Sequence, residues 1–81
     1  MKWKPAFKQI LVEKHKPEGF AISTNKKGKV LAVGQKEDEI LLGKQVILHD
    51  YVREIELEDD KGEIKEYYLI DRESVALIRE E

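Results

Sequence analysis

The sequence predicts an all-β fold, built as a single small domain over residues 1–81. Apolar residues come in short runs of about four to six, separated by glycine, proline or clusters of charge, which is typical of strands. No segment shows the pattern of a long helix, and 81 residues leave no room for a second domain. Several short strands without a long helix indicate a small barrel or sandwich.

Three strands are predicted in the first part of the chain. The apolar runs at residues 9–12, 29–33 and 45–48 each have the length of a buried strand. Gly28 and Gly34 bound the second run, and glycine at both ends of an apolar run marks turns or breaks in pairing.

A β-hairpin is predicted over residues 52–70. Ile55 and Leu57 alternate with charged residues, so one face of this strand is apolar. Gly62 can take the positive φ of a tight turn, after which residues 64–70 return as the partner strand. The opposite face carries three glutamates: Glu54, Glu56 and Glu58.

The C-terminal segment, residues 71–78, has two interpretations. Asp71 could cap a helix, and Ala76 and Leu77 favour one. Val75 to Ile78 could instead form a last strand after a single turn. We predict the turn and strand, because the preceding strands leave sheet edges that need a partner.

Composition limits how so small a domain is reinforced. The chain has no cysteine, which excludes disulfides and thiolate metal sites, and two histidines are too few for a histidine-built metal centre. Self-association is the remaining reinforcement. No apolar run is long enough to span a bilayer, and the N-terminal residues lack the apolar core of a signal peptide, so we expect a cytoplasmic protein without a membrane partner.

Charge is divided between the two halves of the chain. Residues 1–36 hold nine lysines and two glutamates, a net of +7, whereas residues 37–81 hold six basic and fifteen acidic residues, a net of −9. The overall charge of −2 argues against a dedicated nucleic-acid binder. Halves of opposite sign attract each other within one chain or between neighbouring copies.

Residues 15–28 do not fit a core. Pro17 and Gly19 discourage regular structure, and residues 23–28 are polar and basic. A loop of this length is uncommon in a compact domain and is often functional. Its apolar triplet, Phe20-Ala21-Ile22, is either packed into the core or presented to a partner.

Along nearly its whole length the chain resembles the GroES co-chaperonin family. The most specific stretch is Gly-Lys-Val-Leu-Ala-Val-Gly at residues 28–34. The other similar segments, in the family's order, are Lys4-Pro5 with residues 10–12, then residues 42–48, 66–70 and 73–78.

The resemblance implies a small GroES-like β-barrel that assembles into an oligomeric ring, a heptamer in that family, and caps a GroEL-type chaperonin during ATP-dependent folding. It also implies that a mobile loop, here at about 15–28, docks on the chaperonin's apical domains through glycine and an apolar triplet. The implied docking residues are Gly19, Phe20, Ala21 and Ile22. The implied subunit interface pairs the first and last strands of adjacent copies, here Lys2, Trp3 and Lys4 with Val75, Ala76, Leu77 and Ile78.

Two departures from the family pattern are visible. The loop is shorter than usual, Glu18 stands where the family has a first glycine, and Ala21 is a small middle residue. Only residues 35–39 separate Gly34 from Ile40, where the family inserts a roof hairpin.

No catalytic, metal or cofactor site is expected. His49-Asp50 lacks a nucleophile placed by any motif, and the acidic residues 58–60 lack the spacing of a Ca²⁺ loop. The basic stretch at residues 26–29 has too few glycines for a phosphate-binding loop. Two alternatives to a co-chaperonin remain: a scaffold or regulatory protein of the same fold that no longer binds a chaperonin, and a small-barrel nucleic-acid-binding protein.

Overall fold

The computed structural model describes residues 3–14, 26–49 and 52–80. The prediction of an all-β fold is confirmed, because the described residues form six strands and two short 3-10 turns. No helix in this part of the chain combines the length and the apolar character that a membrane crossing requires. The elements in chain order are β1 (Gln9–Lys14), β2 (Lys26–Val33), η1 (Lys36–Leu41), β3 (Gln45–Leu48), β4 (Arg53–Glu58), β5 (Ile64–Asp71), η2 (Arg72–Ser74) and β6 (Val75–Ile78).

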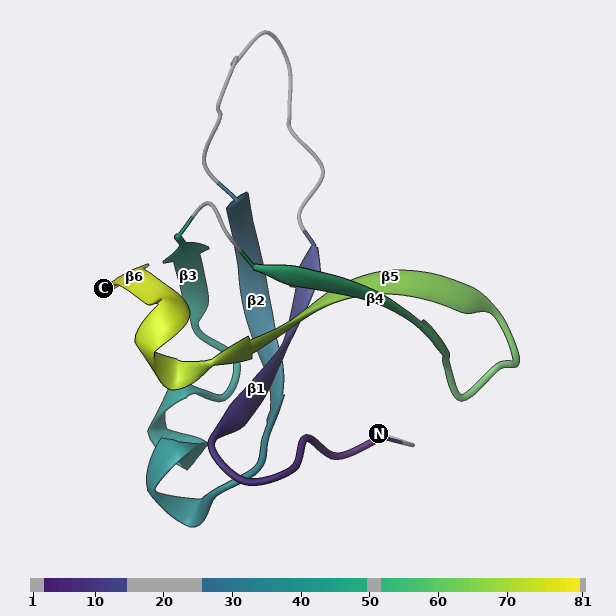
Figure 1. Ribbon diagram of the computed structural model, residues 1–81, viewed down its shortest axis with the longest axis horizontal. Coiled ribbons are helices and arrows are strands. Elements are labelled where there is room, and N and C mark those ends of the chain that lie inside the picture. Colours follow the sequence, from purple (N-terminus) through teal and green to yellow (C-terminus); the bar gives the residue numbers. More distant parts are fainter. Residues whose placement is uncertain (1–2, 15–25, 50–51, 81) are drawn as a thin grey trace, which may run out of the picture.

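The six strands form one antiparallel sheet in the order β4-β5-β1-β2-β3-β6. The β4–β5 hairpin lies across β1, β2 and β3, so the sheet is strongly bent (Figure 1). The predicted hairpin and the predicted turn and strand at the C-terminus are both present. β4 and β6 are the edge strands of this sheet.

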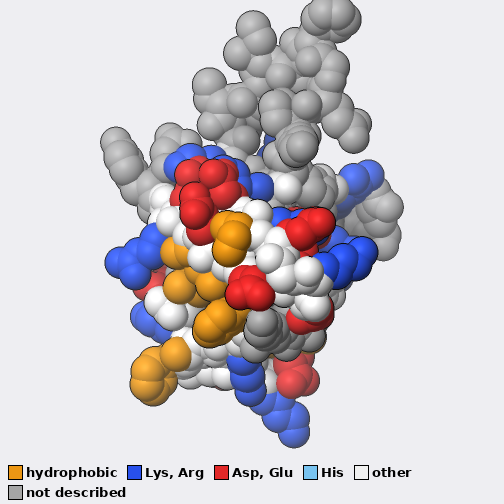
Figure 2. Space-filling model, turned by 90° about the vertical axis from the view of Figure 1, so that its right-hand side faces the viewer, with side chains coloured by type: hydrophobic (Ala, Val, Ile, Leu, Met, Phe, Trp, Pro, Cys, Tyr) orange, Lys and Arg blue, Asp and Glu red, His pale blue; other side chains and the backbone are white. Residues whose placement is uncertain are grey.

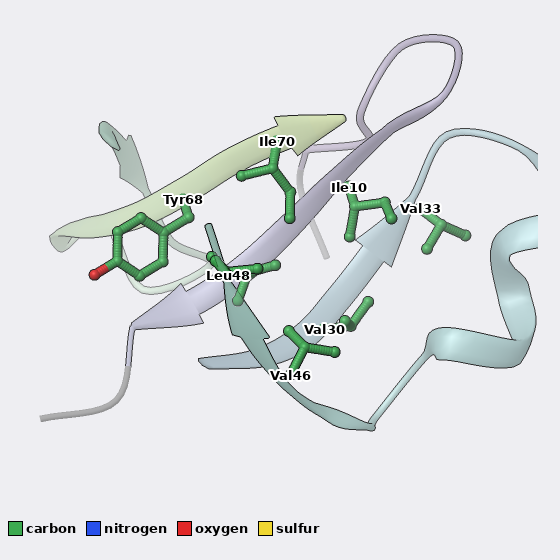
Figure 3. Packing of buried hydrophobic residues seen from close by; sticks show 8 residues of the cluster. Ile10, Val30, Val33, Val46, Leu48, Tyr68 and Ile70 are labelled. Carbon is green, nitrogen blue, oxygen red and sulfur yellow. The ribbon is translucent and has the colours of Figure 1, made fainter. Parts of the chain in front are cut away.

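The main core lies on the inner face of the bend (Figure 3). It is made of aliphatic side chains and one tyrosine from four strands, and alternate residues of β1 and β3 point into it. The residues are Ile10 and Val12 of β1, Val30 and Val33 of β2, Val46 and Leu48 of β3, and Tyr68 and Ile70 of β5.

A register shift in β2 allows two valines to face the same core. Val30 and Val33 are three residues apart, which in a regular strand would place them on opposite faces. They pair with Val12 and Ile10, and the register shifts between Leu11 and Val12. This bulge therefore inserts one extra residue into β2 and turns both valines inward.

β1 is buried on both of its faces. Leu11, which points away from the main core, is only 1% exposed. The N-terminal segment covers this second face, and its Trp3 and Pro5 line a shallow cleft together with Leu11 and Leu69. The continuous apolar run at residues 10–12 is thus explained by burial on two sides.

The predicted loop at residues 15–28 ends earlier than expected. Residues 26–28 belong to β2, because Lys26, Lys27 and Gly28 pair with Leu48, Ile47 and Val46 of β3. Their lysine-rich composition suggested a loop, but Lys27 is exposed on the strand. Residues 15–25 lie outside the described residues.

The turn of the β4–β5 hairpin is organised by Asp59. Its carboxylate oxygen Oδ1 accepts hydrogen bonds from the backbone N–H groups of Lys61 and Glu63, both at 2.9 Å. Gly62 has φ 83°, as the sequence predicts, and its N–H donates to the Asp59 carbonyl at 3.1 Å. Lys65 adds an ion pair at 3.3 Å. The backbone hydrogen bond from Glu63 is the largest cause of a lowered pKa at Asp59.

Replacing Asp59 with alanine is expected to destabilise the hairpin, whereas asparagine should retain most of its stability because its side-chain oxygen still accepts both bonds. A lowered pKa in the folded state gives stability that is present above the ordinary aspartate pKa of about 4 and is lost as pH falls through the folded value. Acid titration of thermal stability should therefore be shallower for Asp59→Asn than for the wild type below about pH 4. Identical acid profiles for the two proteins would contradict this role of Asp59.

Candidate protein-interaction surfaces

The strand β6 presents apolar side chains at the edge of the sheet. It pairs with β3 through Val46↔Ile78, Ile47↔Leu77 and Leu48↔Val75. Leu77 is 63% exposed and Ile78 is 43% exposed. Within the described part of the chain no strand pairs with its other edge. An exposed apolar edge strand favours pairing with another chain.

A groove of about 390 Å³ runs along this edge. Most of its lining residues are apolar, and Lys27 and Arg79 add positive charge. The Arg79 guanidinium donates a hydrogen bond to Gln45 Oε1 at 2.9 Å. The lining residues are Lys27, Gln45, Val46, Ile47, Leu77, Ile78 and Arg79. The groove therefore extends the apolar surface of β6 onto β3.

The N-terminal segment forms a second exposed apolar surface, on the outer face of β4 and β5. Trp3 is held there by a hydrogen bond from its indole Nε1 to the Glu58 carbonyl at 3.1 Å, yet it remains 47% exposed. The cleft beside it, of about 160 Å³, is lined by Ile55, Leu57 and Leu69 among others. Figure 2 shows the side of the molecule toward which the hairpin points, where apolar side chains gather in a band bordered by charged ones.

Phe7 was missed by the sequence analysis. It has a φ of 54° and is 81% exposed, in a turn closed by a hydrogen bond from the Gln9 N–H to the Ala6 carbonyl. A left-handed conformation costs a residue other than glycine about 1–2 kcal/mol. An exposed aromatic side chain held at such a cost is typical of a functional contact. Neither glycine nor asparagine marks this turn, so composition gave no signal.

The predicted interface residues fall into two sets on different sides of the domain. Trp3 and Lys4 are exposed near the β4–β5 hairpin, whereas Val75 to Ile78 lie at the opposite edge. Lys2 lies outside the described residues. Surfaces on different sides cannot form one patch within a chain, but they can meet between two copies.

Two oppositely charged side chains, one in the N-terminal segment and one in η2, pair with each other within the chain. Lys8 forms an ion pair with Glu73 at 3.2 Å. A hydrogen bond to its own backbone and then Lys8 lower the pKa of Glu73. Lys8 and Glu73 therefore join the N-terminal segment to η2.

Arg72 ties η1 to η2. Its Nη2 donates to Gln35 Oε1 at 2.7 Å, to Asp38 Oδ2 at 2.9 Å and to Glu37 Oε1 at 3.1 Å. Asp38 is only 5% exposed, so this guanidinium supplies the partner that its buried carboxylate needs. Glu37 and then Asp38 raise the pKa of Arg72. The segment after Gly34, where the sequence leaves no room for a roof hairpin, is thus a short 3-10 turn fixed to the base of the sheet.

The predicted docking residues, Gly19, Phe20, Ala21 and Ile22, lie outside the described residues. The structure places the residues that flank them. β1 ends at Lys14 and β2 begins at Lys26, so segment 15–25 joins two neighbouring strands at one end of the domain. In Figure 1 this end is opposite to η1.

The described residues hold no group of three or more potential metal ligands. The side chain of His49 is exposed, and its backbone N–H donates to the Ser74 carbonyl at 2.9 Å. Its neighbour Asp50, the other member of the His-Asp pair, lies outside the described residues. A comparison of the chain with known protein families and with curated proteins finds no match.

Proposed function

We propose that the protein is a co-chaperonin. Each copy is a small GroES-like β-barrel, and the copies assemble into a ring, a heptamer by the family resemblance. The ring caps the apical domains of a GroEL-type chaperonin and assists ATP-dependent protein folding in the cytoplasm. The chain itself performs no catalysis and needs no cofactor, metal or nucleic acid for this role.

The observation that carries the proposal is the position of Lys14 and Lys26, the described residues that flank segment 15–25, relative to the two exposed apolar surfaces. Lys14 and Lys26 lie at one end of the sheet, while the two surfaces flank the sheet at its sides. Contact between different surfaces of successive copies is heterologous and closes into a ring when the rotation allows. In such a ring the Lys14 and Lys26 ends of every copy lie on the same face.

A ring explains how weak contacts produce firm binding. Burying Phe20 and Ile22 gains roughly 3–6 kcal/mol before costs, since each large apolar side chain contributes about 1.5–3 kcal/mol. Ordering the segment consumes a large share of this gain, at about 1 kcal/mol or more per residue. Several segments on one ring bind jointly, because every contact after the first is intramolecular. The cap therefore holds firmly and still leaves when the chaperonin changes conformation.

The replacement Ile22→Asp tests the proposal. We expect it to abolish binding to a GroEL-type chaperonin and the stimulation of ATP-dependent refolding, because a charged side chain replaces half of the apolar contact. Ile64→Asp is the matched control, since Ile64 is 65% exposed at the turn end of β5, where it pairs with Glu58 of β4. Native mass should be the same for both variants.

Chaperonin binding that survives Ile22→Asp would remove the apolar triplet from the mechanism. A ring that binds no chaperonin even as the wild type would identify a scaffold instead. Salt-sensitive binding of single-stranded nucleic acid by the wild type would favour the nucleic-acid alternative.

A further inference from the structure

The sheet ends in two open edges, β4 and β6, which run in opposite directions. Within the described residues neither of these strands pairs with a further one. All strand pairs are antiparallel, so direction alternates along the order β4-β5-β1-β2-β3-β6. When a second copy continues the sheet in the same order, its β4 therefore lies antiparallel to β6 of the first copy. The same junction repeats from each copy to the next.

The open edge of β4 has a defined length. Alternate residues of an antiparallel strand bond to the partner strand, and the backbone groups of the residues between them point away from it. The bond from the Asp59 N–H across the hairpin fixes this alternation, so every second residue from Glu58 back to Glu54 faces the open edge. Trp3 agrees with this direction, because its indole donates to the Glu58 carbonyl at 3.1 Å. The indole occupies the end of the edge next to the turn, which leaves Glu54 and Glu56 for a further strand.

The open edge of β6 is equally short and is apolar. The Arg79 N–H donates to the Gln45 carbonyl at 2.9 Å, so by the same alternation the backbone groups of Ile78 face away from β3. Ala76 has no partner residue on β3, because the register of the pair shifts beside it. β6 therefore offers two residues to a further strand, which is as many as β4 leaves open.

Charge favours contact between unlike edges. β4 carries three glutamates and one arginine, so pairing of two β4 edges would bring glutamates together. The groove along β6 is lined by Lys27 and Arg79 and, among the described residues, by no acidic side chain, so pairing of two β6 edges would bring cations together. Like charges on neighbouring strands are destabilising, whereas an acidic edge and a basic edge attract each other. The favoured contact therefore joins β4 of one copy to β6 of another.

We propose that β4 of each copy adds to β6 of the next, so that one continuous antiparallel sheet runs around the ring; this inference rests on the ring of the proposed function and names its junction. Leu77 lies on the side of the sheet opposite to the main core, because it pairs with Ile47, which lies between the core residues of β3. Ile55 and Leu57 lie on the same side, where they line the cleft beside Trp3. At the junction Leu77 lies beside them, and the groove along β6 and the cleft beside Trp3 become one apolar surface.

Disulfide trapping tests the junction, because the chain has no cysteine of its own. Residues directly opposite at a non-hydrogen-bonded position have Cα atoms about 4.5 Å apart, which is within the range of a disulfide. Leu77→Cys is combined with Ile55→Cys in one variant and with Leu57→Cys in a second. After mild oxidation at least one of them should give a ladder of covalent dimers, trimers and larger species on a non-reducing denaturing gel.

Leu77→Cys combined with Ile40→Cys is the matched control, because Ile40 is exposed on η1, away from both edges. This control and Leu77→Cys alone should remain single chains. Absence of the ladder from both test variants would overturn the junction. Covalent dimers of Leu77→Cys alone would also overturn it, because they would show two β6 edges in contact.

Glu56→Pro tests the backbone bonds of the junction. Proline lacks the N–H that this position directs to the open edge, and an edge strand tolerates proline where its nitrogen faces outward. The variant should stay folded by circular dichroism and lose its assembly in native mass, whereas Glu56→Ala keeps the N–H and should assemble like the wild type. Retained assembly of Glu56→Pro would overturn the junction.

Amide hydrogen exchange of the wild type gives the same answer if Glu56→Pro does not fold. The N–H groups of Glu56 and Ile78 should exchange slowly in the assembled protein and rapidly after dilution to single chains, because only the neighbouring copy protects them. Rapid exchange of both amides in the assembled protein would overturn the junction.

Binding to a GroEL-type chaperonin separates this inference from the proposed function. An assembly that gives the disulfide ladder and binds no chaperonin would refute the co-chaperonin role and support the junction. An assembly that binds the chaperonin and gives no ladder would refute the junction alone. A wild-type chain that is a strict monomer would refute the junction together with the ring.

Discussion

Replacing Gly28 with alanine is expected to destabilise the domain by about 3 kcal/mol or more, because overpacking a closely packed position is among the costly single changes. Gly28 is buried where β2 crosses between β1 and β3. A Cβ atom there would overlap the Glu13 carbonyl oxygen and the Val12 side chain. The carbonyl belongs to the backbone of a central strand, so relief requires the two strands to separate. Urea unfolding measures the loss directly.

Gly43→Ala is the matched control for this experiment. Gly43 has φ 78°, but a Cβ atom there meets nothing within 4 Å. Its replacement should cost only the backbone preference, about 1 kcal/mol. Similar losses for the two variants would show that backbone conformation, and not the close approach of β1 and β2, makes Gly28 necessary.

Leu77→Glu is expected to dissociate the proposed ring into folded single chains. Leu77 is 63% exposed, so its replacement should leave the fold of each copy intact. Losing the burial of one leucine weakens each contact by roughly 1.5–3 kcal/mol, which is a factor of about 10–150 per interface. A ring has as many such interfaces as copies, so the effect is multiplied. Sedimentation velocity at micromolar concentration measures the change.

Ile40→Glu is the control for assembly. Ile40 is 74% exposed on η1, outside the edge surface of β6, and should tolerate the charge without loss of the ring. An unchanged sedimentation coefficient for Leu77→Glu would remove β6 from the interface. Loss of assembly by Ile40→Glu would place the interface at η1.

The strands were predictable because their apolar periodicity has a simple physical cause. Ile55 and Leu57 alternate with glutamates on a strand covered on one face only, and Gly62 takes the positive φ that closes the hairpin. The run at residues 10–12 marks a strand covered on both faces. Both apolar patterns are local consequences of burial, so a single sequence is enough to predict them.

Features that depend on contacts between distant residues were not predictable. The bulge that turns Val30 and Val33 to the same side follows from the register with β1. Gly28 and Gly34 were predicted as breaks at the ends of a strand, whereas a Cβ at Gly34 would overlap the Phe7 carbonyl oxygen, which no local pattern indicates. The start of β2 at Lys26 was hidden by its lysine-rich composition, because exposed strand residues and loop residues are equally polar.

The candidate site was partly predictable. Exposure of Leu77 and Ile78 at a sheet edge agrees with their assignment to an interface, but the assignment itself came from the resemblance and stays a proposal. The ion pair between Lys8 and Glu73 joins residues that are far apart in the chain, so no local pattern indicates it. The ammonium groups of Lys14 and Lys26 both approach the Tyr68 ring, and no local pattern indicates this contact between three strands.

The central claim is that several copies of segment 15–25 bind one chaperonin jointly, which requires several copies of the chain in one particle. Native mass spectrometry of the purified chain tests this claim most directly. We predict a closed assembly whose mass is seven times that of the 9.5 kDa chain. A strict monomer of 9.5 kDa at concentrations well above the micromolar range would contradict the capping mechanism, because a single chain has only one copy of segment 15–25.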